Sequence, residues 1–307
     1  LIPSLAAQGL SATSQFAVFD ISGPIAGVII GILTVLVVAG GFKRISTVMD
    51  YMVPIMAVVY IAGAVVIIVA NIQNLIPAFG QIFRYAFTPH AAVGGFSGST
   101  IMLALRWGAA RGVYSNEAGF GTAPAAHSSA DVDHPIRQAC WGVFEVTVDT
   151  LIVCTFTALA VLTSGVWTSA KYESGALAQA AFNSVFGSFG DYFVAISVFL
   201  FVFSTIVVCV YYGQRQAEFL FGLKFSKWWR WVYPIVMVMA TFGIDLTMMY
   251  MITDGFLAAI MIPNMIALII LVPQVAKLQK EYFNTPDKYY LADKAAKEIK
   301  KAQKAAQ

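Results

Sequence analysis

The chain has 307 residues, of which 59% are hydrophobic and only 11% are charged, and its mean hydropathy is +0.76. These values lie far outside the range of soluble globular domains, so the sequence predicts an integral membrane protein. The net charge is +3, and the basic residues lie in loops and in the C-terminal tail. This excess of positive charge indicates the orientation of the protein in the membrane rather than a surface that binds nucleic acid.

Apolar runs of roughly 20 residues recur along the chain, which favours an all-α membrane bundle over a β-barrel of short alternating strands. Residues 1–19 are expected to be the end of a preceding helix, and the start without Met or a signal peptide predicts the C-terminal portion of a longer protein. Seven spans follow: Pro24–Gly40, Val53–Ala70, a segment from Phe96 into a polar motif, Trp141–Ser164, Tyr192–Gly213, Trp231–Phe242 and Met248 to about Ala276. Residues 1–276 are then a transmembrane domain and 277–307 a basic tail.

Basic residues occupy every second loop between these spans. They are Lys43 and Arg44, then Arg137, then Arg215, Lys224, Lys227 and Arg230, then the tail from Lys277. The intervening loops contain only Arg84 in the first and Lys171 in the second, and none around Asp245. The positive-inside rule therefore predicts a cytoplasmic C-terminus, with Asp20 outside.

Several features of the spans and loops favour packing or anchoring over chemistry. Gly23, Gly27 and Gly31 form a small-residue face that lets another helix approach closely. Residues 164–187 are expected to form a short re-entrant or surface helix. The tryptophans at 228, 229 and 231, beside Lys227 and Arg230, predict an interfacial belt.

The cysteines and histidines give no sign of a metal centre. Cys140, Cys154 and Cys209 lack CxxC spacing and are interpreted as small core residues. The three histidines, at 90, 127 and 134, belong to no metal-binding motif. We therefore expect no cofactor and no metal centre.

The stretch GVYSNEAGFGTAPAAHSSA, residues 112–130, interrupts the apolar chain with glycines, an amide and a carboxylate. A helix broken inside a membrane is typical of a transporter's binding site, because unwound carbonyls and helix ends can hold ions and charged substrates. Arg106, Arg111 and Glu117 would be costly if they faced lipid. The alternative is a cytoplasmic loop with Ser115 or Asn116 as an ordinary helix cap, and composition leaves both interpretations open.

This motif, followed by VDTLIVCTFTAL at 148–159, closely resembles the alanine or glycine:cation symporter family, the sodium:alanine symporters. Members carry a G-x-x-SNEAG-x-G-x-AP block and then a DT-x-VVCT helix. The stretches FSTIVVCVYYGQRQAEFLFG (203–222), GGFKRIS (40–46) and VPIMAVVY (53–60) also resemble the family, in its order. The resemblance implies a leucine-transporter-type bundle of five-plus-five inverted repeats. The chain would then be the C-terminal two-thirds, from the end of core helix three through core helix ten, without the first broken helix.

The resemblance also implies a set of binding residues. Ser204 and Thr205 match the paired hydroxyls that this fold uses as sodium ligands; the alternative is that each hydroxyl bonds the carbonyl one turn back. Gln8 matches an amide that holds the amino acid's polar end, although Gly9 stands where the family has Asn; it could equally be an interhelical hydrogen-bonding residue. The Asn116 amide, or carbonyls around Gly112 and Gly119, would face the substrate ammonium or a cation.

Two further acidic positions have competing interpretations. Glu117 is expected to pair with Arg111 or Arg106 and so lock the broken helix. Glu145 and Asp149 are four residues apart and so share a helix face. Asp149, in the DT motif, is either a cation or proton site or a partner of the same arginines.

One departure from the family concerns selectivity. Cys209 lies near the position where the family usually has Trp. The loss of a large aromatic wall would enlarge the pocket, so we expect acceptance of a neutral amino acid bulkier than alanine or glycine.

The leading functional hypothesis is sodium-coupled symport of small neutral amino acids by alternating access, in the cell membrane and as a multi-pass protein. Its partners would be the amino acid, sodium and the lipid bilayer, with no nucleic acid. The alternatives are a proton-coupled transporter of the same fold and a non-transporting membrane fragment or subunit. An enzyme is not expected, because no nucleophile–base pair or metal motif occurs in the sequence.

Overall fold

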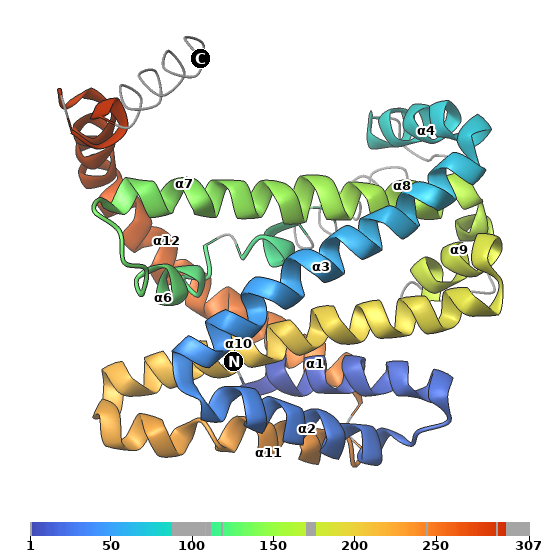
Figure 1. Cartoon of the computed structure of the whole chain (residues 1–307), viewed down its shortest axis with the longest axis horizontal. Helices are drawn as coiled ribbons and strands as arrows, with labels where there is room; N and C mark the ends of the chain where they lie inside the picture. Colours follow the sequence, from blue (N-terminus) through green and yellow to red (C-terminus); the bar gives the residue numbers. More distant parts are fainter. Residues whose placement is uncertain are drawn as a thin grey trace, which may run out of the picture. The chain divides into compact units, whose positions relative to one another are not determined.

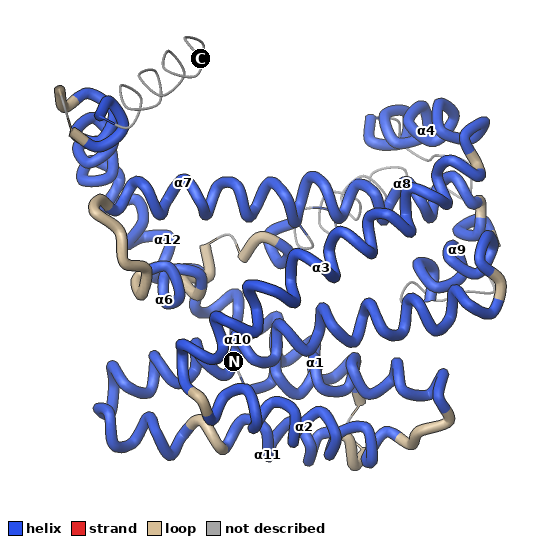
Figure 2. The backbone as a smooth tube through the Cα atoms, viewed as in Figure 1, coloured by secondary structure: helices blue, strands red, loops and turns tan. Residues whose placement is uncertain are grey.

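The structure, a computed structural model, describes residues 2–87, 108, 112–117, 119–169, 176–243, 245–286 and 288–292. These residues form helices and connecting turns, with no strand among them (Figure 2). The principal helices, labelled in Figure 1, are α1 (Ile2–Gln15), α2 (Gly23–Ala39), α3 (Gly41–Ala70), α4 (Leu75–Phe87), α6 (Ala123–His127), α7 (Pro135–Val146), α8 (Cys154–Ser164), α9 (Leu177–Phe186), α10 (Ser188–Trp229), α11 (Val232–Ala240) and α12 (Leu246–Asn284).

The chain divides into two compact units. The first comprises Leu1–Gly112 and Thr150–Phe256, and the second comprises Val113–Asp149 and Leu257–Gln307. A π-helical segment, Thr147–Val153, connects α7 to α8. The predicted boundary between residues 276 and 277 falls inside α12, which continues to Asn284.

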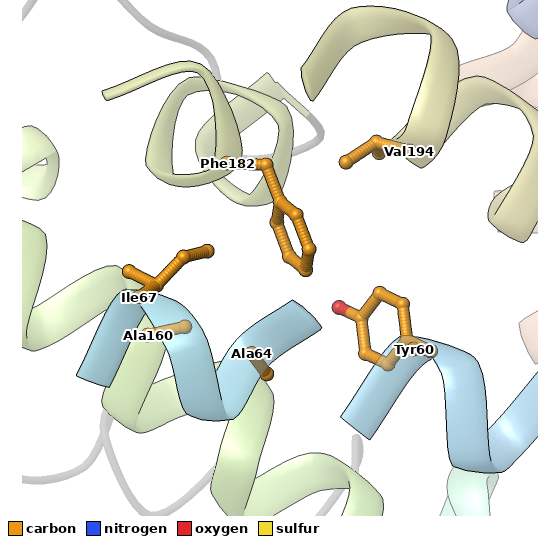
Figure 3. Close-up of a cluster of buried hydrophobic side chains, with 6 residues drawn as sticks. All are labelled: Tyr60, Ala64, Ile67, Ala160, Phe182 and Val194. Atoms are coloured by element: carbon orange, nitrogen blue, oxygen red, sulfur yellow. The ribbon is translucent and has the colours of Figure 1, made fainter. Parts of the chain in front are cut away.

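The core of the first unit lies where α3, α8, α9 and α10 meet. Figure 3 shows the buried side chains there, with the Phe182 ring pointing from α9 toward α3; the cluster is Tyr60, Ala64, Ile67, Ala160, Phe182 and Val194. The Tyr60 ring lies 5.5 Å from that of Phe182, and its hydroxyl accepts a hydrogen bond of 3.1 Å from Thr157. Because lipid is as apolar as these side chains, close packing and such interhelical bonds stabilise the cluster more than transfer from water does.

A second packed group in the first unit joins α1, α2 and α11. A Cβ added at Gly27 would lie 2.9 Å from the Thr241 side chain, and one at Gly31 would lie 2.8 Å from Val238. The predicted close approach of a helix along this glycine face is therefore confirmed at these two positions. The predicted face is wrong at Gly23, which has open space around it because it stands at the very start of α2.

The membrane spans differ in part from the prediction of seven. Among the described residues four helices are long and apolar enough to cross a membrane, or up to five if a pair bent by 118° counts as one. The four are Gly41–Ala70, Pro135–Ser164, Ser188–Trp229 and Met248–Ala292, and the bent pair is Ile2–Phe19 with Gly23–Ala39. Four predicted spans are thus found within longer helices, and Pro24–Gly40 corresponds to α2. The segment from Phe96 lies mostly outside the described residues.

The predicted span Trp231–Phe242 is wrong as a separate crossing. The helix there, α11, has nine residues. At 1.5 Å per residue it is about 14 Å long, less than half of the hydrocarbon core. The short helix expected within 164–187 is confirmed as α9.

The cysteines also differ in part from the prediction. Cys209 is buried, as expected of a small core residue, whereas Cys140 and Cys154 are exposed. Both exposed cysteines lie on the Pro135–Ser164 span, where an apolar side chain can face lipid as readily as protein.

Candidate functional site

The polar motif forms a turn that ends one helix and starts another. Gly112 to Ser115 are helical, and α6 begins at Ala123. Between them the backbone φ is positive at Glu117 (52°), Gly119 (81°) and Gly121 (75°). The left-handed region is comfortable for glycine but costs a residue with a Cβ, so Glu117 adopts it only because its surroundings hold it there. Most of the helix that leads into this turn lies outside the described residues, so the broken membrane helix and the loop with an ordinary cap both stay predictions.

Asn264 of α12 holds this turn within the second unit. Its side-chain N–H donates a hydrogen bond of 2.8 Å to the Gly119 carbonyl. A Cβ at Gly121 would lie 2.8 Å from Asn264 Oδ1, and one at Gly119 would lie 3.0 Å from Met265 Sδ. The two glycines therefore let the turn lie directly against α12. The sequence analysis missed Asn264, although an isolated amide after Pro263 in an apolar run was a usable signal.

The Glu117 carboxylate is bound inside the turn itself. The Thr122 hydroxyl donates a hydrogen bond of 2.5 Å to Glu117 Oε2. The turn lies outside the helices long enough to span a membrane. Burial raises the pKa of the Glu117 carboxyl above its ordinary value; the Thr122 hydrogen bond opposes this, and nearby Glu145 adds to it. The expected partners Arg106 and Arg111 lie outside the described residues, so that pairing stays a prediction.

The two acidic residues of the following span have different partners. The Ser115 hydroxyl donates a hydrogen bond of 2.7 Å to Asp149 Oδ2. Glu145 Oε2 lies 3.4 Å from His127 Nε2, and the other ring nitrogen of His127 lies 2.8 Å from the Gln138 amide. Asp149 falls in the π-helical segment, which starts after Glu145, so the two carboxylates are not held at regular α-helical spacing. Asp149 thus joins the DT motif to the SNEAG turn through Ser115.

The paired hydroxyls lie on α10 in the first unit. Ser204 donates to the Phe201 carbonyl at 2.7 Å and Thr205 to the same carbonyl at 3.0 Å. This is the bonding one turn back that was considered as the alternative to a sodium site. The two interpretations are compatible, because a hydroxyl that donates its hydrogen keeps its oxygen lone pairs for a cation.

The remaining predicted residues are divided between the units. Gln8 is half-buried on α1, which packs against α10, and Cys209 is buried on α10 itself. Gly112 ends the first unit, while Asn116 and Gly119 lie in the turn of the second. The structure therefore places Gln8 and the paired hydroxyls on adjacent helices of one unit.

Comparisons with known proteins agree on one family. The family model described as the sodium:alanine symporter family matches residues 3–296. This match covers nearly the whole chain and does not bear out the narrower expectation of a C-terminal two-thirds. The chain is 44% identical over 296 residues to the uncharacterized transporter YflA of Bacillus subtilis, covering 95% of this chain and 62% of YflA.

Two further relatives carry more specific names. The chain is 36% identical over 255 residues to the sodium/alanine symporter AgcS of Methanococcus maripaludis, covering 82% of this chain and 55% of AgcS. It is 35% identical over 249 residues to GlnT of Bacillus subtilis, described as a probable sodium/glutamine symporter, covering 80% of this chain and 51% of GlnT. The chain thus spans between half and two thirds of the length of these relatives.

Proposed function

The chain belongs to the sodium:alanine symporter family, and from this premise we propose that the protein carries a small neutral amino acid across the cell membrane together with sodium. Family and relatives are transporters, which points away from an enzyme. With several helices able to span a bilayer, the protein is a multi-pass membrane protein. The leucine-transporter-type architecture of inverted repeats and the cytoplasmic C-terminus belong to the same proposal.

The observation that carries the sodium assignment is the hydroxyl pair on α10. Both hydroxyl hydrogens are used on the Phe201 carbonyl, so the lone pairs of Ser204 Oγ and Thr205 Oγ1 are oriented away from that bond. Sodium, like other hard cations, prefers such oxygen ligands. In the first unit we assign the polar end of the amino acid to Gln8. Within the second unit, Asn116 and the backbone near Gly119 are proposed as oxygen donors for an ammonium group or a cation.

Coupling requires that sodium and the amino acid favour the same conformational state. Ligands change a conformational equilibrium only through their different affinities for its states. Bound sodium would stabilise the state that exposes the amino acid site to one side, and release to the other side would complete the cycle.

The test is alanine uptake into proteoliposomes with and without an inward sodium gradient. We expect sodium-dependent uptake by the native full-length protein and its loss in the double variant Ser204→Ala, Thr205→Ala. The matched control is Ser184→Ala, Thr47→Ala. Ser184 donates to the carbonyl three residues back at 2.7 Å and Thr47 to the carbonyl four back at 2.9 Å, as in the α10 pair. Equal loss in both double variants would show that intrahelical hydrogen bonding, not sodium, is the reason.

Proton coupling is the second candidate, and Asp149 is the residue that favours it. A carboxylate within a span that accepts one hydroxyl bond can also accept a proton. In one outcome, uptake is driven by a proton gradient, is independent of sodium and is lost in Asp149→Asn. This result would identify the proton, and not sodium, as the coupling ion. Absence of uptake of any neutral amino acid would favour a non-transporting role.

The substrate is proposed to include amino acids bulkier than alanine. Cys209, 8% exposed on α10, is a small residue where the family usually has Trp. The naming of GlnT for glutamine shows that a relative is associated with a larger neutral substrate. We expect Cys209→Trp to lose glutamine uptake while keeping alanine uptake, and an unchanged substrate range would contradict the assignment.

A further inference from the structure

The helical backbone of α10 is interrupted near its C-terminal end, at Gly222. The backbone there is non-helical, with φ of 83° and ψ of 172°, inside a helix of 42 residues. Around and after this point the sequence reads FLFGLKFSKWWRW, residues 219–231, which we call the basic aromatic arm. It contains Lys224, Lys227 and Arg230, and the sequence has no carboxylate between Glu218 and Asp245. The arm is therefore a run of positive charge with no internal neutralisation.

One side of the arm is fixed by a series of aromatic contacts. Ring centroids of Phe221 and Phe225 are 4.8 Å apart, those of Phe225 and Trp229 5.3 Å, and those of Trp229 and Tyr233 6.1 Å. The Trp229 indole N–H donates a hydrogen bond of 2.9 Å to the Tyr233 hydroxyl, and Tyr233 is only 4% exposed. The last of these contacts reaches across the turn between α10 and α11, so this series holds the arm to α11.

The arm also leaves large apolar side chains exposed, including Phe221 of the aromatic series. Phe219 is 87% exposed, Leu220 66% and Trp228 62%, and Phe221 and Leu223 are similarly exposed. Lys224 and Lys227 are exposed in the same stretch. Exposed apolar side chains with cations interspersed in the same stretch of chain fit an interface that is apolar on one side and anionic on the other.

Arg230 adds a more specific feature at the end of the arm. Its guanidinium lies over the Trp231 ring, 4.8 Å from the centroid, so the side chain is held in place. Its Nε atom is buried and has no hydrogen-bond acceptor within the described part of the chain. The Arg230 side chain as a whole is partly exposed, and an arginine is well suited to a phosphate oxygen.

We propose that the basic aromatic arm binds the phosphate group of an anionic phospholipid at the membrane surface, with Lys224, Lys227 and Arg230 as the cationic ligands. The exposed Phe, Leu and Trp side chains would lie among the acyl chains of the same lipid. This commits the site to a lipid rather than to free phosphate, because a soluble anion would leave that apolar surface uncovered. The inference does not depend on which amino acid or ion the protein transports.

The test is tryptophan quenching by brominated lipids in vesicles that contain the full-length protein. The probe is dibrominated phosphatidylglycerol in a phosphatidylcholine bilayer, with dibrominated phosphatidylcholine as the reference. Each cation near an anionic membrane surface contributes to the binding free energy. Removal of one should therefore lower the preference for phosphatidylglycerol over phosphatidylcholine by about fivefold. We expect this loss for each of Lys224→Gln, Lys227→Gln and Arg230→Gln alone, and a loss of about a hundredfold in the triple variant, where the three factors multiply.

The matched control is Lys43→Gln, Lys277→Gln, Lys280→Gln, which removes the same charge from exposed positions outside the arm. This control should retain the preference for phosphatidylglycerol. So should the variant Lys224→Arg, Lys227→Arg, Arg230→Lys, which keeps all three positive charges. An equal preference in the triple glutamine variant and the native protein would overturn the proposal, and so would displacement of the lipid by inorganic phosphate. If the triple variant does not fold, the pair Lys224→Gln, Lys227→Gln, which changes only exposed side chains, gives the same comparison.

Discussion

The Glu117 side chain accepts a hydrogen bond from Thr122 within its own turn. Its backbone is left-handed, its carboxylate accepts from Thr122 five residues later, and the carbonyl of Gly119 two residues on is bound by Asn264. Two hydrogen bonds thus hold a backbone conformation that would otherwise cost about 1–3 kcal/mol. A carboxylate placed in this way acts on the shape of the turn, and through it on any ligand of the turn.

Replacing Glu117 by Gln is expected to change the pH dependence of stability. The native pKa is raised by burial, so the folded state binds more protons than the unfolded state between the two pKa values. Stability therefore falls as pH rises through this interval, by about 1.4 kcal/mol for each unit of difference. The Gln side chain still accepts from Thr122 and does not titrate. We expect thermal unfolding of Glu117→Gln in detergent to lose this decline with pH.

The control for this prediction is Thr122→Val. It removes the hydrogen bond that lowers the Glu117 pKa, so the decline in stability with rising pH should be steeper than in the native protein. A native protein whose unfolding temperature rises relative to Glu117→Gln over the same interval would contradict the assignment.

Gly213→Ala is expected to destabilise the contact between α10 and α11. A Cβ there would overlap the Tyr233 hydroxyl and ring, which are themselves held by Trp229. Overpacking of this kind costs about 1–3 kcal/mol. The matched control is Gly255→Ala in α12, which has nothing within 4 Å and should be neutral or stabilising by about 0.5–1 kcal/mol. Unfolding temperatures in detergent that fall equally in both variants would refute the steric explanation.

For single residues, the sequence predicted which positions need a small side chain better than it predicted which residues form hydrogen bonds with each other. The small face at Gly27 and Gly31 followed from helical spacing alone, because spacing fixes which side chains share a face. The Thr122 partner of Glu117 depends on positive φ values at 117, 119 and 121, which no periodicity encodes. Asn264 lies far from the motif in sequence, so only folding brings it to the turn.

Among the elements, α7 owes its first turn to a histidine. His134 is buried, and its Nδ1 accepts a hydrogen bond of 3.2 Å from the Ile136 N–H, as an N-cap residue does. The same ring lies 5.1 Å from that of Tyr282 and 4.7 Å from that of Tyr289. One side chain therefore both caps α7 and packs against the end of α12 and the residues after it.

His134→Ala should weaken both contacts, and two further variants separate them. Asn at this position keeps a capping acceptor, and Phe keeps the ring. Loss of the cap alone is expected to cost about 0.5–2 kcal/mol and to speed amide hydrogen exchange in the first turn of α7. Accelerated exchange at Ile136 and Arg137 in His134→Phe but not in His134→Asn would support the capping role. Faster exchange in His134→Asn but not in His134→Phe would show instead that packing of the ring stabilises this turn.

The limits of the helices were harder to predict than their existence. Lys43 and Arg44 indicated a loop, yet α3 begins at Gly41 and includes both, because charged side chains in a first helical turn can remain exposed. Conversely, the apolar run after Trp231 indicated a full span, but α11 stops after nine residues, at Ala240. An apolar composition indicates that a segment can lie in lipid. It does not predict the length of the helix, which ends where the chain turns, as it does after Ala240.

For the whole molecule, composition alone predicted a helical membrane protein, and the family match and the span-length helices agree. The division into two units was not predicted, since the second unit joins residues 113–149 to residues 257–307 across more than a hundred intervening positions. The five-plus-five repeat and the sodium site remain proposals at this scale. A measurement on binding, independent of transport, distinguishes the sodium site from a purely structural hydroxyl pair.

If sodium binds the folded protein at Ser204 and Thr205, sodium must also stabilise it. A ligand that binds only the folded state raises the unfolding free energy by RT ln(1 + [L]/Kd), about 2.7 kcal/mol at a hundredfold excess over Kd. We expect the unfolding temperature in detergent to rise when choline is replaced by sodium at constant ionic strength, in the native protein and in Ser184→Ala, Thr47→Ala. The rise should vanish in Ser204→Ala, Thr205→Ala. An undiminished rise in that variant would place the bound sodium elsewhere, and a rise produced equally by potassium would reflect general salt effects.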